Sequence, residues 1–154
     1  MVINMDHQFY MREALTQAQK ALELGEVPIG AVLVKEHNII ARDFNCRENT
    51  NDPTAHAELR VIRKGAKLQG NWRLHDCTLY VTLEPCPMCA GAILNSRIKR
   101  LVFGAFDPKG GAAGTIINLL EDARFNHRVE IISGVLEEDC KEILQSFFKN
   151  LRKK

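Results

Sequence analysis

Apolar residues recur with a helical period at the start of the chain. Between residues 7 and 24 they stand three or four positions apart, and Gly25 follows where helices usually end, so we predict a helix there. Branched apolar residues over 29–34 and 39–41 flank Glu36-His37-Asn38, which has turn chemistry. This second pattern is typical of a β-hairpin.

The next segment changes from a polar stretch to a second helical pattern. Residues 45–51 are mixed and polar, which predicts a loop. Asp52-Pro53 is a helix start signal because proline fits the first turn of a helix. Good helix formers fill residues 55–68 and end at Gly70, so we predict a helix over this range.

Strand and helix patterns alternate in the second half of the chain. Residues 78–83 have strand composition, and Pro85 then opens a predicted helix over 86–94. Further along, the pattern predicts a strand over 100–106, a glycine-rich loop over 108–114, a short helix over 116–120, a strand over 128–135 and an amphipathic helix over 137–151. Together these elements favour a single α/β domain over 1–154, a layered sandwich with some parallel strand pairing.

The composition is that of an ordinary globular protein. Hydrophobic residues make up 45% of the 154 positions and charged residues 26%, which excludes a disordered or fibrous chain. The net charge of +2 is too small to indicate a nucleic acid partner by itself. The five cysteines are an odd number, which predicts a reduced, cytoplasmic protein. No apolar run approaches the roughly 18 residues of a membrane span, so we expect no membrane partner.

Two short motifs carry the candidate chemistry: His56-Ala57-Glu58 and Pro85-Cys86-Pro87-Met88-Cys89, each at a predicted helix start. The spacing of Cys86 and Cys89 puts both sulfur atoms on one face of a helical turn, where the helix N-terminus favours thiolates. With His56 they would give three protein ligands, the number that catalytic zinc sites use while keeping the fourth position for water. An unligated Glu58 beside that water would be a general base.

Each motif alone has a simpler explanation. A C-x-x-C pair in a reduced protein can be a redox dithiol, and His-x-Glu pairs occur on helix surfaces by chance. Together, in this order and with proline before the first cysteine, the motifs match the signature of zinc nucleobase deaminases. Side chains two residues apart point about 200° away from each other on a regular helix. The zinc hypothesis therefore predicts that Glu58 reaches across the first turn toward the metal.

On these residues the chain resembles the bacterial tRNA adenosine deaminases, which convert the wobble adenosine of an anticodon to inosine. The likeness runs from about residue 11 to residue 152. It includes Gly25-Glu26-Val27-Pro28-Ile29-Gly30-Ala31, Asp52 through Glu58, Leu79 through Gly91, Ser96-Arg97-Ile98 and Asn126-His127-Arg128-Val129. The His and Cys motifs would fit any cytidine-deaminase-like enzyme, whereas Thr82-Leu83-Glu84-Pro85-Cys86, the 103–114 loop and Asn126-His127-Arg128 indicate the tRNA branch.

The resemblance implies a cytidine-deaminase-like three-layer α/β/α sandwich with a central five-stranded mixed sheet. It also implies one Zn²⁺ per chain and a homodimer that binds a tRNA anticodon stem-loop partly across its two chains, with no DNA partner. By this likeness His56, Cys86 and Cys89 are zinc ligands and Glu58 is the proton shuttle. Six further positions match residues that contact the flipped base and its neighbours: Asn45, Asp107, Lys109, Asn126, Phe148 and Arg152.

The residues by themselves leave other interpretations open. Asn45 and Asp107 can simply shape turns, and Phe148 has the spacing of a core residue. Three other functions remain as alternatives: a deaminase of free nucleobases or nucleosides such as cytosine or guanine, a thiol oxidoreductase that uses Cys86 and Cys89, and an inactive zinc-binding RNA module.

Overall fold

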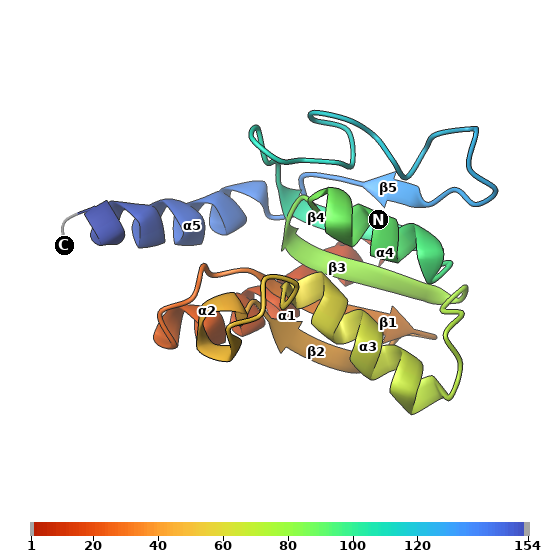
Figure 1. Cartoon of the computed structure of the whole chain (residues 1–154), viewed down its shortest axis with the longest axis horizontal. Helices are drawn as coiled ribbons and strands as arrows, with labels where there is room; N and C mark the ends of the chain where they lie inside the picture. The colour runs from red at the N-terminus through yellow and green to blue at the C-terminus, as the bar shows by residue number, and fades with distance from the viewer. Residues whose placement is uncertain (1, 153–154) are drawn as a thin grey trace.

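Five strands form one mixed sheet in the computed structural model, which describes residues 2–152 (Figure 1). The sheet has the order β2-β1-β3-β4-β5, and the strands are β1 (Gly30–Lys35), β2 (Asn38–Phe44), β3 (Cys77–Leu83), β4 (Arg100–Ala105) and β5 (Glu130–Ile132). β1 pairs antiparallel with β2 and β3, whereas β4 pairs parallel with β3 and β5. Both the hairpin and the later parallel pairing are therefore confirmed.

Helices cover both faces of this sheet. They are α1 (Val2–Glu23), α2 (Arg47–Thr50), α3 (Ala57–Gln69), α4 (Pro87–Asn95) and α5 (Glu137–Arg152). In Figure 1, α3 and α4 lie in front of the sheet and α1 lies behind it, while α5 extends away to one side. α5 contacts β4 and α1. The predicted three-layer α/β/α arrangement is confirmed.

Alternate residues of the central strands contribute to two separate cores, as the two-residue period of a strand requires. Leu79 and Leu101, which are partners in the β3–β4 pairing, lie in the core shared with α3 and α4. Their neighbours Tyr80 and Val102 face the other way and pack with Met11 of α1. The sheet is thus buried on both faces, and its strand ends are left to carry the loops.

Three local predictions are wrong, each because a residue outside the segment forms hydrogen bonds with its backbone. Residues 47–50 form α2 in place of the predicted loop, and the carboxylate of Glu26 accepts the backbone N–H groups of Glu48 and Asn49. Residues 116–120 form no helix, since the N–H of Ile116 donates to the carbonyl of Gly111.

The last strand is the third departure. The sequence pattern predicts a strand over 128–135, but β5 covers only Glu130–Ile132. Only these three residues pair with β4, and the N–H of Val129 donates to the carbonyl of Leu120 instead. No helix in residues 2–152 combines the length and the apolar character needed to cross a bilayer.

Gly30 tests the packing of α1 on the sheet. A Cβ at this position would lie 2.0 Å from the carbonyl oxygen of Ala14 and 2.4 Å from the backbone nitrogen of Ala18. We expect Gly30→Ala to lower the free energy of unfolding by about 1–3 kcal/mol, the usual cost of overpacking. Gly91→Ala is the control, because a Cβ there meets nothing within 4 Å. Equal stability of the two variants in urea titrations would contradict this packing.

Candidate active site

Two helices begin at the same place, beside the end of β3. His56 is the residue before α3 and Cys86 the residue before α4, and both have extended backbone dihedrals rather than helical ones. Pro87 occupies the first turn of α4, where a missing N–H costs nothing. An ion pair with Arg60 of α3, 2.9 Å long, ties that helix to Asp43 near the end of β2. The sheet therefore fixes both helix starts relative to each other.

The ligand atoms of His56, Cys86 and Cys89 converge at this point. His56 Nδ1 lies 3.7 Å from Cys86 Sγ and 3.5 Å from Cys89 Sγ, and the three atoms all lie within 4.8 Å of one another. Within residues 2–152, no other group of three His, Cys, Asp or Glu side chains is arranged to hold a metal ion. The nitrogen directed at the sulfurs is Nδ1, a choice that the sequence leaves open.

The hydrogen bond between the two thiols shifts their pKa values in opposite directions. A hydrogen bond from Cys89 lowers the pKa of Cys86 to about 4, and a bond from His56 acts in the same direction against the effect of burial. The pKa of Cys89 is raised, first by its bond to Cys86 and then by burial. One imidazole nitrogen and two sulfurs are ligands that Zn²⁺ prefers, so the donor set fits that ion.

Glu58 lies beside the cluster with its side chain buried. It is only 4% exposed, and its carboxyl group interacts with the Cys89 thiol, its own backbone N–H and the charge of His56. Burial raises the pKa of Glu58 to about 7. The expected 200° separation does not arise, because His56 precedes α3 and only Glu58 belongs to the helix. Glu58 therefore faces the three candidate ligands rather than bulk solvent.

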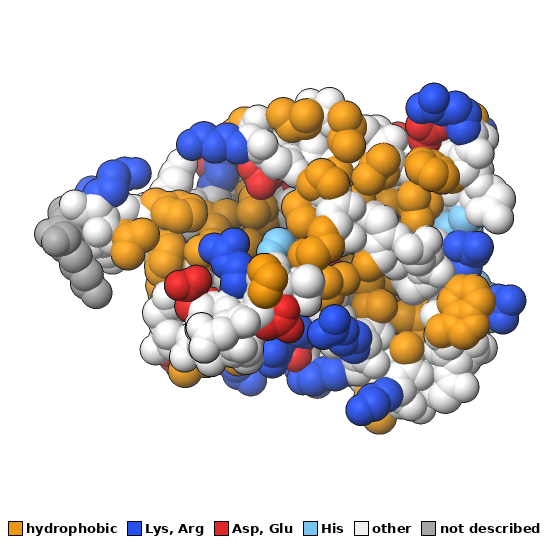
Figure 2. Space-filling model, in the orientation of Figure 1, with side chains coloured by type: hydrophobic (Ala, Val, Ile, Leu, Met, Phe, Trp, Pro, Cys, Tyr) orange, Lys and Arg blue, Asp and Glu red, His pale blue; other side chains and the backbone are white. Residues whose placement is uncertain are grey.

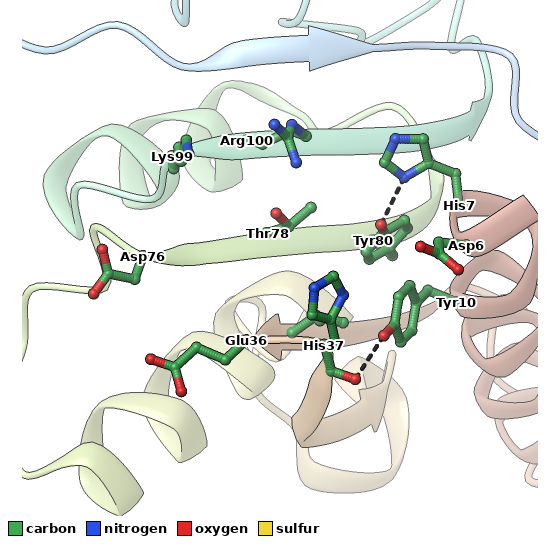
Figure 3. Close-up of a pocket in the computed structure, with 11 residues that line it drawn as sticks. Asp6, His7, Tyr10, Glu36, His37, Asp76, Thr78, Tyr80, Lys99 and Arg100 are labelled. Atoms are coloured by element: carbon green, nitrogen blue, oxygen red, sulfur yellow. Dashed lines mark hydrogen bonds between the residues drawn. The ribbon is translucent and has the colours of Figure 1, made fainter. Parts of the chain in front are cut away.

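A small cavity opens next to this group. It has a volume of about 90 Å³ and is lined by His56, Ala57, Glu58, three residues from the preceding loops (Val27, Ile29 and Asn45) and Arg47 at the start of α2. A larger cavity of about 490 Å³ lies elsewhere, around Tyr10, Thr78 and Arg100 (Figure 3). None of the predicted site residues lines the larger cavity. It lies at the start of β3, where Thr78 is, whereas Cys86 follows the end of that strand.

Comparison with known proteins identifies the family. The sequence model of the MafB19-like deaminase family matches residues 5–152. The tRNA-specific adenosine deaminase of Bacillus subtilis is 59% identical over 147 residues, which cover 96% of this chain and 91% of that protein. The chain belongs to the tRNA-specific adenosine deaminase family. The Haemophilus influenzae member is 55% identical over 143 residues, 92% of this chain and 83% of its own length.

Solved structures agree with this assignment. A tRNA:A34 deaminase, which edits A to I at the wobble position of transfer RNA, has a TM-score of 0.85 and 47% identity, covering 88% of this chain and 99% of that one. A guanine deaminase from Bacillus subtilis has a TM-score of 0.62 and 44% identity over 65% of this chain and 64% of that one. The fuller match is thus to the tRNA deaminase.

The six predicted substrate residues of this deaminase chain fall into three groups. Asn45 is buried in the small cavity, where its side chain also donates to the Val27 carbonyl and accepts the Arg47 N–H. Asp107 and Lys109 share one loop, in which Asp107 Oδ1 accepts the Lys109 N–H and so shapes a turn. The remaining three are exposed, Asn126 on the loop before β5 and Phe148 and Arg152 on α5.

Of these six residues, only Asn45 lines the cavity beside the His56, Cys86 and Cys89 cluster. Asn45 and Asp107 also accept nearby backbone N–H groups, as turn-forming residues do. Phe148 is 42% exposed, so the interpretation as a core residue is wrong. Arg47, Val27 and Ile29 also line the cavity, and the sequence assigns none of them a role. Val27 and Ile29 belong to the Gly25–Ala31 stretch on which the family resemblance partly rests, and this stretch also contains an acid that the structure buries.

That acid is Glu26, which holds α2 beside the cavity. It is 1% exposed, and its carboxylate accepts the N–H of Glu48 and both the N–H and the side-chain amide of Asn49. Burial works against the charge, but the bonds from Asn49 and Glu48 hold the pKa of Glu26 below 4.5. Arg47, which lines the cavity, is thereby fixed at the start of α2.

Glu26→Gln should destabilise the chain in a pH-dependent way. We expect the free energy of unfolding at pH 7 to fall by about 1.5–3 kcal/mol, since hydrogen bonds to a charged acceptor are lost. A lowered folded-state pKa stabilises above the unfolded pKa, so the difference from wild type should shrink as the pH falls below 4.5. Exposed Glu48→Gln is the control. A difference that stays constant from pH 7 to pH 3 in denaturant titrations would disprove the role of this charge.

Proposed function

We propose that the protein catalyses hydrolytic deamination of adenosine to inosine at the wobble position of a tRNA anticodon. The observation that carries this proposal is the convergence of His56, Cys86 and Cys89 with buried Glu58 beside them. Family membership supports adenosine as the substrate, and a tRNA substrate implies a cytoplasmic enzyme.

The three ligands would hold one Zn²⁺ per chain. A zinc ion held there supplies Lewis acidity, which lowers the pKa of a water molecule from about 15.7 toward about 7. Glu58 accepts the proton that this water loses and passes it to N1 of adenine as oxygen attacks C6. Glu58 then moves a second proton from the new hydroxyl to the departing amine. Water is consumed, ammonia leaves and no redox cofactor is needed.

An adenine within a stacked helix could not reach this small cavity, so the nucleotide must be single-stranded or turned out of its stack. An anticodon loop meets this condition at little cost. The exposure of Lys109, Asn126, Phe148 and Arg152 supports their role as contacts to the loop, since cations attract phosphates and an exposed aromatic ring can stack on a base. Asn45, inside the cavity, is placed for the flipped base.

A second copy of the chain is the proposed partner. Large apolar side chains are exposed on α4 (Met88) and on the loops between β4 and β5 (Ile116, Ile117 and Phe125). Figure 2 shows hydrophobic atoms gathered on the face of the molecule that carries α4. Exposed apolar clusters of this kind mark interaction surfaces. Sedimentation of the purified chain should give the mass of two chains, and Phe125→Asp should shift it toward one. A wild-type monomer at micromolar concentration would refute the homodimer.

Deamination of free bases is the rival function, favoured by the likeness to a guanine deaminase. The deciding experiment incubates the protein with anticodon stem-loops and, separately, with guanine and cytosine. We expect inosine at the wobble position alone and no ammonia from the free bases. Turnover of a free base without inosine in the stem-loop would overturn the proposed substrate.

Glu58→Ala should separate metal binding from chemistry. We expect the variant to keep about one zinc per chain, because Glu58 is not a ligand, and to form inosine at least about 100-fold more slowly, the usual size of a general-base contribution. Metal analysis and single-turnover kinetics measure the two effects. Exposed Glu121→Ala serves as the control, and activity within a few-fold of wild type in Glu58→Ala would end the assigned role.

Cys86→Ala tests the ligand assignment itself. We expect it to lose most bound zinc and to unfold at a lower temperature, because metal binding contributes to folding stability. Cys46→Ala is a matched control, since Cys46 is also a free cysteine but lies outside the cluster. Cys86→Ala with full zinc content would show that the ligand set is wrong.

A further inference from the structure

Glu84 is a buried acid that the proposed chemistry does not use. It stands between the last residue of β3, Leu83, and the Pro85-Cys86 turn that leads into α4. Its side chain is 2% exposed, and within residues 2–152 no cationic side chain pairs with it. A buried carboxylate without a cation must be satisfied by other donors.

The donors all come from one loop, residues 107–115. Oε1 accepts the backbone N–H of Asp107 at 3.1 Å and the hydroxyl of Thr115, while Oε2 accepts the N–H groups of Ala113 at 3.1 Å and Thr115 at 3.0 Å. Each carboxylate oxygen therefore accepts two bonds. The loop is wrapped around the charge rather than merely adjacent to it.

The backbone of the loop approaches this carboxylate too closely for any side chain. A Cβ on Gly111 would lie 2.4 Å from the carboxyl carbon of Glu84. The same segment is also bonded to the neighbouring turn, where the N–H of Ala112 donates to the Pro85 carbonyl at 2.8 Å. The 107–115 loop and the turn that carries Cys86 thus form one hydrogen-bonded unit.

This unit links two parts of the proposed site. Asp107 and Lys109, which are candidate substrate contacts, lie at one end of the loop, and the Asp107 N–H is one of the four donors to Glu84. We propose that Glu84 is a positioning residue that fixes the substrate loop relative to the metal-ligand turn, through its four hydrogen bonds. This inference rests on the proposed function for the identity of the substrate, but the hydrogen bonds can be tested without it.

Glu84→Gln is the sharpest test, because glutamine has the same size and replaces one acceptor by a donor. All four partners of Glu84 donate, and only the Thr115 hydroxyl can turn to accept. The amide nitrogen of the glutamine should therefore take the place of Oε1, where it faces the Thr115 hydroxyl. Because the Asp107 N–H donates to the same oxygen in the wild type, it would then have no acceptor. We expect amide hydrogen exchange in 107–115 to speed up about tenfold or more, the size of effect that one lost buried hydrogen bond produces.

The kinetic readout separates positioning from general destabilisation. At a temperature where the variant stays folded, we expect KM for an anticodon stem-loop to rise about tenfold, with kcat changed much less and zinc content still one per chain. Glu121→Gln, the same change on an exposed acid outside the 107–115 loop, is the matched control. Normal exchange and normal KM in Glu84→Gln, or loss of zinc together with kcat, would overturn the proposal.

Thr115 supplies a second test if Glu84→Gln fails to fold. Thr115→Ser keeps the hydroxyl and should retain the wild-type KM and exchange rate, whereas Thr115→Val removes the hydroxyl and should raise both. Identical behaviour of the two variants would contradict the role of this bond. If the wild-type chain leaves the stem-loop unchanged, the proposed function fails by itself, and the exchange rates still decide whether Glu84 holds the loop.

Discussion

The approach of one imidazole nitrogen to two sulfur atoms is the interaction on which the proposed function of this protein depends. His56 Nδ1 lies within 3.7 Å of both Sγ atoms, although His56 and Cys86 are 30 residues apart in the chain. Burying an imidazole and two thiols contributes less to the stability of the fold than burying apolar side chains would, because polar groups lose their hydration when they are buried. Its proposed value is chemical, as a set of zinc ligands.

The fold makes this approach possible by starting two helices beside one strand end. Residues before a helix can adopt extended dihedrals, so His56 and Cys86 can turn toward each other while Glu58 and Cys89 are held by helical geometry. Buried carboxylates then fix the surrounding loops. Glu26 holds α2 and Glu84 holds the 107–115 loop, each by accepting backbone N–H groups. Buried carboxylates in this protein thus order a short helix in one case and a loop in the other.

Sequence patterns could predict what depends on neighbours along the chain. Helix ends are one example: Gly25 and Gly70 both have positive φ, which glycine adopts without strain. The hairpin, β3 and α4 follow from apolar period and from Pro85 in the same way. The ligand cluster was predictable because two motifs of fixed spacing both stood at helix starts. Its identity as a deaminase site needed the likeness to a family, since spacing alone also fits a redox dithiol.

What the patterns could not predict depends on partners far away in the sequence. α2 is held by Glu26, which accepts the N–H groups of Glu48 and Asn49. Residues 116–120 are not helical because their backbone bonds to the loop around Glu84. The cavity residues Val27 and Ile29 are likewise held by a partner far along the chain, because the backbone N–H and the side-chain amide of Asn45 donate to their carbonyl groups.

The proposed zinc ion held by His56, Cys86 and Cys89 is tested most directly by X-ray absorption at the zinc edge of the purified protein. The account predicts one zinc per chain with two sulfur neighbours at about 2.3 Å and nitrogen or oxygen neighbours at about 2.0 Å. A zinc-free protein with Cys86 and Cys89 joined in a disulfide, or a zinc ion with no sulfur neighbour, would contradict it.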